Sequence, residues 1–138
     1  MKKAIITGAT GFIGQRLVGA IDSNIRVLSR EKQPDYETIV CDLQSEVIPD
    51  SALDEVDTVF HLAGFSHDFR DATKIQKLYQ KVNVDATIRL AKIAVKSNVK
   101  RFVFVSSVKA GGNPPLGTCA NEKDQKNTED VYGKTKRE

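Results

Sequence analysis

The segment YGKTK places a tyrosine, Tyr132, four residues before a lysine, Lys136. On a helix this spacing puts both side chains on one face. A tyrosine phenol with its free pKa of about 10 is a poor base at neutral pH, and a neighbouring ammonium group favours its ionised form. The pair could therefore exchange a proton with a substrate hydroxyl. Taken alone, the same letters would fit a polar segment with an unrelated tyrosine and lysine.

A glycine-rich loop near the amino terminus could hold an anion. The sequence ITGATGFIG spaces Gly8, Gly11 and Gly14 three residues apart, directly after a short apolar run. Gly8 permits a tight turn, Gly11 lets a pyrophosphate approach the N-terminus of a helix, and Gly14 lets that helix pack closely. The spacing differs from the common G-x-G-x-x-G fingerprint. A strand before the loop and a helix after it nonetheless favour a dinucleotide loop over a ligand-free turn.

Short apolar runs alternate with helical patterns along the chain, and these elements must position the two motifs. We expect strands at 3–7, 25–29, 38–41, 58–62 and 101–107, helices from residue 12 and before residue 56, and a long helix. The apolar face of the long helix carries Ile75, Leu78, Tyr79, Val82, Ala86, Leu90, Ile93 and Ala94. This order predicts an α/β fold with a Rossmann-type, doubly wound parallel sheet of about five strands.

The composition changes in the last part of the chain. Gly, Pro, Asn, Asp and Thr dominate from Gly111 to Asp130. We therefore expect one dinucleotide-binding domain over 1–138, in which 111–138 form a loop or mobile tail that ends in the start of the Tyr132–Lys136 helix.

Several segments, in order, resemble one family. TGATGFIG is similar to the cofactor loop of the extended short-chain dehydrogenase/reductase family, the NAD(P)-dependent sugar-nucleotide epimerases and dehydratases. CDL (41–43), HLAG (61–64), VNVDAT (82–87), FVSS (104–107) and YGKTK (132–136) resemble later family segments, with Ala86 where the Asn-Val-x-Gly-Thr signature has glycine. The resemblance covers nearly the whole chain, but only about the first half of a typical member.

The resemblance also implies a set of site residues. Ser107 would bind the reacting hydroxyl, Tyr132 would exchange its proton, and Lys136 would in addition hold the cofactor ribose. Asp42 would contact the adenine. The other cofactor-binding residues would be Gly8, Gly11, Phe12, Ile13, Gly14, Leu43 and Ala63.

The end of the second strand bears on the choice of dinucleotide. An acidic residue there accepts a bond from the ribose 2′-OH of NAD, whereas an arginine accommodates the 2′-phosphate of NADP. The segment VLSRE places Arg30 at this position, followed by Glu31. We therefore expect NAD(P) as cofactor, with NADP(H) weakly favoured. A solvated arginine without a ligand role is the alternative.

Composition limits the other functions. The chain has 138 residues, of which 40% are hydrophobic and 28% charged, as in one globular domain. A net charge of +3 with scattered basic residues favours neither nucleic-acid nor membrane binding. No apolar run has the length of a membrane span or signal peptide, and no metal-ligand spacing occurs. The separated Cys41 and Cys119 favour a reduced, cytoplasmic protein.

Three isolated residues receive a plain interpretation. His61 is expected at a strand end with its ring bonded to backbone, and catalysis is the alternative. His67 is expected in an exposed loop, and contact with a substrate is the alternative. Cys41 is expected to be a small buried residue.

The resemblance implies a UDP-hexose 4-epimerase type of enzyme acting on a nucleotide sugar. Tyr132 would take a proton from a sugar hydroxyl while hydride passes to the cofactor, and the ketosugar would receive the hydride on its other face. An NADP-dependent reductase or a dehydratase is the alternative within the family, although Val108 and Lys109 stand where a dehydratase usually has acidic residues. A non-catalytic dinucleotide-sensing module is the alternative of another class.

Because the family's substrate region would lie beyond residue 138, we expect this chain to bind cofactor and to be inactive alone. The fifth strand would then be an exposed sheet edge, and a homodimer is an open alternative.

Overall fold

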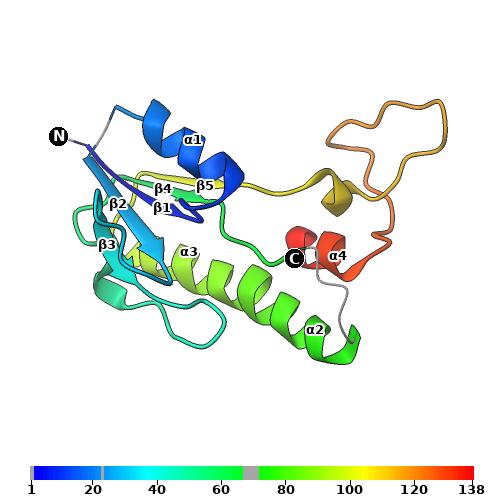
Figure 1. Cartoon of the computed structure of the whole chain (residues 1–138). Coiled ribbons are helices and arrows are strands. Elements are labelled where there is room, and N and C mark those ends of the chain that lie inside the picture. The colour runs from blue at the N-terminus through cyan, green and yellow to red at the C-terminus, as the bar shows by residue number, and fades with distance from the viewer. Residues whose placement is uncertain (1, 23, 67–71) are drawn as a thin grey trace.

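The computed structural model describes residues 2–22, 24–66 and 72–138 (Figure 1). Five parallel strands form one sheet in the order β3-β2-β1-β4-β5. The strands are β1 (Lys3–Thr7), β2 (Asn24–Ser29), β3 (Glu37–Val40), β4 (Thr58–His61) and β5 (Arg101–Phe104). The chain winds outward from β1 to β3 and then crosses to the other side of β1. The expected Rossmann-type sheet is therefore confirmed, with β5 at one edge.

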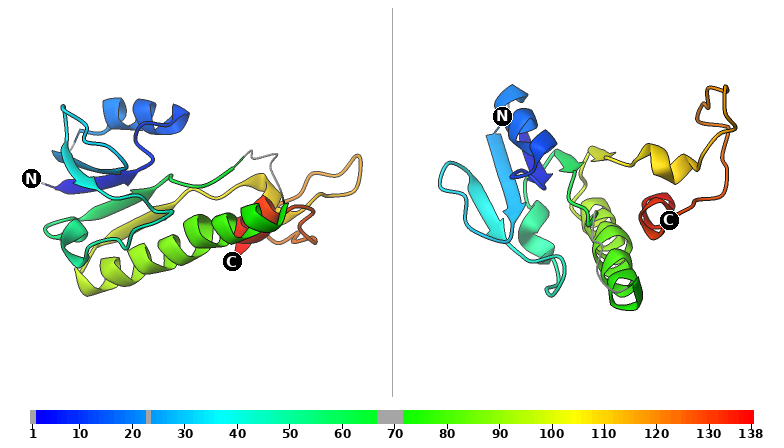
Figure 2. Two further views of the ribbon diagram at one scale, coloured as in Figure 1. Left: turned by 60° about the horizontal axis from the view of Figure 1, so that its bottom comes forward. Right: turned by 45° about the vertical axis from the view of Figure 1, so that its right-hand side comes forward.

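Helices lie on both faces of the sheet, as Figure 2 shows. The helix α1 (Phe12–Ala20) covers one face, and the long helical segment that follows β4 covers the other. Two short 3-10 helices, η1 (Asp50–Leu53) and η3 (Val108–Gly111), precede β4 and follow β5. Because both faces are covered, the central strands are apolar on both sides. In β1, Ile5 packs toward the long helical segment and Ile6 toward α1.

The long helix differs from the sequence prediction of one regular helix. It consists of α2 (Ala72–Tyr79), a π-helical segment η2 (Gln80–Asp85) and α3 (Ala86–Lys96). The predicted apolar face still packs in the interior, because Val82, Leu90 and Ile93 are buried. Within η2, Asn83 is 2% exposed and bonds to residues outside the helix. A π turn is wider than an α turn and commonly occurs at functional sites.

The last part of the chain extends beyond the sheet. Residues 112–130 contain no helix or strand and form the loop drawn in orange in Figure 1. The helix α4 (Val131–Arg137) follows and packs against η3 and α2. The sequence predicted only the start of a helix here, and the structure forms one of seven residues. The mobility expected for 111–138 remains a prediction.

None of the helices within the described ranges is both long enough and apolar enough to cross a bilayer.

Candidate functional site

The loop between β1 and α1 is shaped by its glycines. Gly8 has a φ of +73°, and a Cβ on it would lie 2.8 Å from the backbone nitrogen of Ala63. A Cβ on Gly14 would lie 2.1 Å from the carbonyl oxygen of Gly8. Gly11 is the N-cap of α1, and its N–H donates to the same oxygen at 3.0 Å. The glycines therefore let α1 begin directly against the carboxyl ends of β1 and β4.

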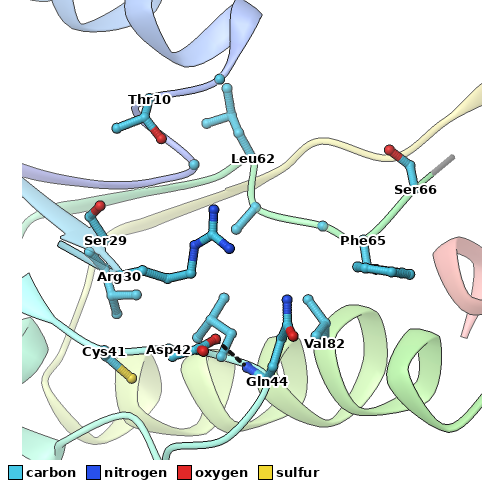
Figure 3. Close-up of a pocket in the computed structure, with 16 residues that line it drawn as sticks. Thr10, Ser29, Arg30, Cys41, Asp42, Gln44, Leu62, Phe65, Ser66 and Val82 are labelled. Atoms are coloured by element: carbon cyan, nitrogen blue, oxygen red, sulfur yellow. Dashed lines mark hydrogen bonds between the residues drawn. The ribbon is translucent and has the colours of Figure 1, made fainter. Parts of the chain in front are cut away.

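A pocket of about 390 Å³ opens at these carboxyl ends (Figure 3). The glycine loop, the ends of β2 and β3, and the segment after β4 form its walls. The predicted residues that line it are Gly8, Gly11, Arg30, Asp42, Leu43 and Ala63. The structure thus brings six of the predicted cofactor residues together, at the point where the strand order reverses. Ligands of open α/β sheets bind at such points.

Phe12, Ile13 and Gly14 lie beside the pocket and are not part of its lining. They form the first turn of α1, where the side chains of Phe12 and Ile13 are largely exposed. The first backbone N–H groups of a helix have no partner within the helix, and they attract anions. The cofactor role of these three residues, through their backbone, remains a prediction.

The far side of the pocket carries polar groups that could distinguish ligands. Figure 3 shows the guanidinium of Arg30 extending into the pocket, across from Asp42 and Gln44. The Oδ1 atom of Asp42 accepts the N–H of Gln44 at 2.9 Å. Cys41 lines the same side and is buried, as expected, and burial raises the pKa of its thiol. A donor and an acceptor therefore line the pocket here.

Lys136 lies behind the opposite wall of the pocket. Lys136 is 6% exposed, and its Nζ donates to the carbonyl oxygen of Val105 at 3.1 Å. Burial lowers the pKa of its ammonium group. A Cβ on Gly64, which lines the pocket, would lie 3.1 Å from this Nζ. Gly64 thus lies between the ammonium group and the pocket.

Ser107 and Tyr132 belong to elements that pack against each other. Ser107 is the N-cap of η3, and its Oγ accepts the N–H of Lys109 at 3.3 Å. The Nζ of Lys109 pairs with Asp130 at 2.5 Å, and Asp130 caps α4 by accepting the N–H of Gly133 at 2.7 Å. A Cβ on Gly133 would lie only 2.5 Å from the Lys109 carbonyl oxygen. The segment with Ser107 is thereby joined to the helix with Tyr132.

Asn83 joins the pocket to α4, whereas the sequence predicts that it orders the long helix through backbone bonds or touches the cofactor region. Its Oδ1 accepts the N–H of Phe65 at 2.7 Å, and its Nδ2 donates to the Phe65 carbonyl oxygen at 3.0 Å. The same Nδ2 lies 3.1 Å from the Oγ1 of Thr135, which precedes Lys136. In the sequence, the VNVDAT segment indicates Asn83 as a family position, but it does not predict the bonds to Phe65 and Thr135.

His61 is fully buried, and the expectation that its ring bonds to backbone is wrong. Its Nδ1 lies 2.6 Å from the Oγ1 of Thr7, and its Nε2 lies 2.8 Å from the Oγ1 of Thr87. Burial, together with the charge of Lys136, lowers its pKa to about 4. The ring is therefore neutral at neutral pH. His67 lies outside the described residues.

The described residues contain no group of three His, Cys, Asp or Glu side chains placed to hold a metal ion.

A parallel sheet, a glycine loop at its switch point and a helix with the Tyr132–Lys136 pair define a dinucleotide-dependent short-chain dehydrogenase/reductase. The family model described as "NAD dependent epimerase/dehydratase family" matches residues 4–138. The chain belongs to this family.

Individual relatives agree with this assignment. A UDP-glucose 4-epimerase of Vibrio cholerae is 33% identical over 99% of this chain and 44% of its own length. An N-acetyl-alpha-D-glucosaminyl-diphospho-ditrans,octacis-undecaprenol 4-epimerase of Escherichia coli O157:H7 is 34% identical over 78% of this chain and 33% of its own. The solved structure of MoeE5 in complex with UDP-glucose and NAD superimposes with a TM-score of 0.83 and 32% identity, over 97% of this chain and 45% of MoeE5. This chain spans less than half the length of each relative.

Proposed function

We propose that this chain is the cofactor-binding and proton-transferring part of an NAD(P)-dependent nucleotide-sugar 4-epimerase. The observation that carries the proposal is the position of Lys136 directly behind the wall of the glycine-loop pocket. In this proposal, the helix that carries Tyr132 and Lys136 would lie beside the dinucleotide. Two 4-epimerases among the relatives support the reaction type.

The residues of the pocket fit a dinucleotide. Gly11 lines the pocket at the N-terminus of α1, where a side chain would occupy the space of a phosphate. Arg30 offers donors and Asp42 offers an acceptor on the opposite side. When bound, the nicotinamide would supply a hydride acceptor and donor.

The chain's own residues would then orient the sugar and move one proton. Ser107 would bind the sugar hydroxyl through Oγ, and Tyr132 would accept its proton at Oη and later return it. Lys136 would hold the ribose and keep a positive charge beside the phenol. Lys136 is buried away from bulk water, and its charge therefore acts more strongly on its neighbours than it would in water.

The cofactor is NAD(P), and Arg30 weakly favours NADP(H). Its guanidinium extends into the pocket, where it could form a charge-assisted, bidentate bond with a 2′-phosphate. Two observations favour NAD instead: the NAD bound in the MoeE5 structure and the neighbouring Glu31. The free cysteines Cys41 and Cys119 fit a reduced, cytoplasmic setting.

A chimera tests the catalytic part of the proposal. Residues 1–138 replace the matching part of the Vibrio cholerae relative, and the chimera is incubated with UDP-glucose and NAD. We expect formation of the C4 epimer, and a loss of at least a hundredfold in the Tyr132→Phe variant, because a general acid–base group contributes about 10²–10⁴-fold. Net accumulation of reduced cofactor with an oxidised sugar would indicate a dehydrogenase instead.

A further inference from the structure

A chain of hydrogen bonds runs through the buried ring of His61. On one side, the N–H of Ala63 donates to the Oγ1 of Thr7 at 3.1 Å, and this hydroxyl lies 2.6 Å from Nδ1 of His61. On the other side, Nε2 lies 2.8 Å from the Oγ1 of Thr87, which donates to the carbonyl oxygen of Asn83 at 2.7 Å.

The directions of these bonds fix the tautomer of the ring. A threonine hydroxyl has one hydrogen, and Thr87 gives its hydrogen to Asn83. The Oγ1 of Thr87 must therefore accept from Nε2 of His61, so the proton of the neutral ring is on Nε2. Nδ1 then accepts the hydrogen of Thr7, while the oxygen of Thr7 accepts from Ala63. Every donor in this series of four hydrogen bonds has an acceptor.

The Thr7 end of this hydrogen-bond series lies at the pocket. Thr7 is fully buried and directly precedes Gly8, and both Gly8 and Ala63 line the pocket. Gly8 packs so closely on the backbone nitrogen of Ala63 that a Cβ would lie 2.8 Å from it. The Thr7–Ala63 bond therefore joins the glycine loop to the wall formed after β4, beside the backbone bond from the N–H of Leu62 to the carbonyl oxygen of Thr7 at 3.2 Å.

We propose that His61 is a positioning residue for the dinucleotide pocket: its Nδ1 orients the Thr7 hydroxyl, and that hydroxyl holds Ala63 against the glycine loop. The proposal rests on the proposed dinucleotide binding. Without an acceptor at Nδ1 the hydroxyl of Thr7 would rotate to another partner, because a buried donor left unbonded is costly. The N–H of Ala63 would then lose its bond to Thr7, and the pocket wall at Ala63 would be held less firmly against the glycine loop. At the other end, Thr87 of α3 accepts from Nε2 and thereby keeps Nδ1 free to accept from Thr7.

Variants of His61 separate the two ends. An asparagine can place its carbonyl oxygen where Nδ1 lies, and a glutamine can place its amide nitrogen where Nε2 lies. We expect His61→Asn to bind NAD or NADP within threefold of the unaltered chain, as measured by calorimetry. His61→Gln and His61→Leu should bind about tenfold more weakly. Affinity is compared among folded variants only, so a loss of stability alone would not produce this order.

Thr7 and Thr87 give a second, independent comparison if the histidine variants do not fold. Thr7→Ser keeps the hydroxyl and should keep the affinity, whereas Thr7→Val should lose about tenfold. Thr87→Ser is the matched control at the other end: it keeps the acceptor for Nε2 and should leave the affinity of the folded protein unchanged, whereas Thr87→Val removes that acceptor and should weaken binding.

The nitrogen-15 spectrum of the unaltered chain tests the tautomer directly. We expect a non-protonated resonance for Nδ1 of His61 and a protonated one for Nε2, and the reverse pattern would overturn the proposal. Equal affinities of His61→Asn and His61→Gln, or of Thr7→Val and Thr7→Ser, would also overturn it while leaving dinucleotide binding intact. If the unaltered chain binds neither dinucleotide, the proposed function fails and the role of His61 fails with it.

Discussion

The ammonium group of Lys136 lies immediately behind Gly64, so that a Cβ on this glycine would approach Nζ to 3.1 Å. Gly64 belongs to the wall of the dinucleotide pocket, and Lys136 belongs to α4, far later in the sequence. This contact brings the helix with Tyr132 and Lys136 to the wall of the glycine-loop pocket. It also requires a charged group to be almost fully buried, and this burial has a measurable effect on stability.

Replacing Lys136 should stabilise the fold at neutral pH. Burial lowers the pKa of its ammonium, so folding penalises the charged form at every pH below that lowered pKa. The penalty fades as the pH rises through the lowered pKa toward the ordinary range of a lysine. We expect Lys136→Met to gain about 1 kcal/mol, or a few degrees in melting temperature, at pH 7, and the gain to shrink at alkaline pH.

Lys134→Met is the matched control, because Lys134 is exposed on the same helix. Its melting temperature should change little at any pH. A clear loss of stability in Lys136→Met at pH 7 would show that the bond to Val105 outweighs the cost of burial.

Gly14 and Gly19 lie on the same helix and should respond oppositely to alanine. A Cβ on Gly14 would meet the Gly8 carbonyl oxygen at 2.1 Å, and backbone atoms cannot move aside cheaply. We expect Gly14→Ala to lower the free energy of unfolding by about 1–3 kcal/mol. A Cβ on Gly19 meets nothing within 4 Å, so Gly19→Ala should raise it by about 0.5–1 kcal/mol. Urea unfolding measures both, and equal effects would contradict the close packing of α1.

Asp130 should control the order of α4. Its carboxylate caps the helix at Gly133 and pairs with Lys109. Asp130→Ala removes both contacts and should cost about 1 kcal/mol locally, whereas Asp130→Asn keeps a capping oxygen and should cost less. Amide hydrogen exchange over 131–137 measures the difference. Unprotected amides in the unaltered chain would instead support the mobile tail that the sequence predicts.

Arg30 should govern the choice between the two dinucleotides. A charge-assisted bond to a 2′-phosphate contributes about 1.5–3 kcal/mol, so we expect NADP(H) to bind about tenfold more tightly than NAD(H). Arg30→Asp should reduce or reverse this preference, because a carboxylate repels the phosphate and accepts a ribose hydroxyl. Competition calorimetry with both cofactors measures the ratio. Equal affinities in the unaltered chain would show that Arg30 does not read the 2′ position.

Local patterns made much of the fold predictable. The β1 strand and the turn at Gly8 depend on residues close in the sequence, so a short window contains the information. The partners of His61 and Asn83 could not be predicted in this way. His61 bonds to Thr7 and Asn83 bonds to Thr135, and these pairs meet only because the sheet and helices bring distant segments together.

The π turn in the long helix coincides with bonds to a distant segment. Its apolar positions follow ordinary helical spacing, and nothing in that spacing distinguishes a wider turn at 80–85. The two bonds from Asn83 to the backbone of Phe65 accompany this turn in the structure. The docking of α4 on η3 similarly relies on the close approach of Gly133 to Lys109.

The most direct test of the account is a calorimetric titration of this chain and its Gly11→Val variant with NAD and NADP. Gly11 has an ordinary φ of −77° and lies at the pocket, where a Cβ would be 3.3 Å from the Gly8 carbonyl oxygen. The variant should therefore fold, as checked by circular dichroism, while its side chain occupies the place of the pyrophosphate. We expect saturable binding by the unaltered chain and none by the variant. Equal affinity in the two folded proteins would contradict the assignment of this loop as the dinucleotide site.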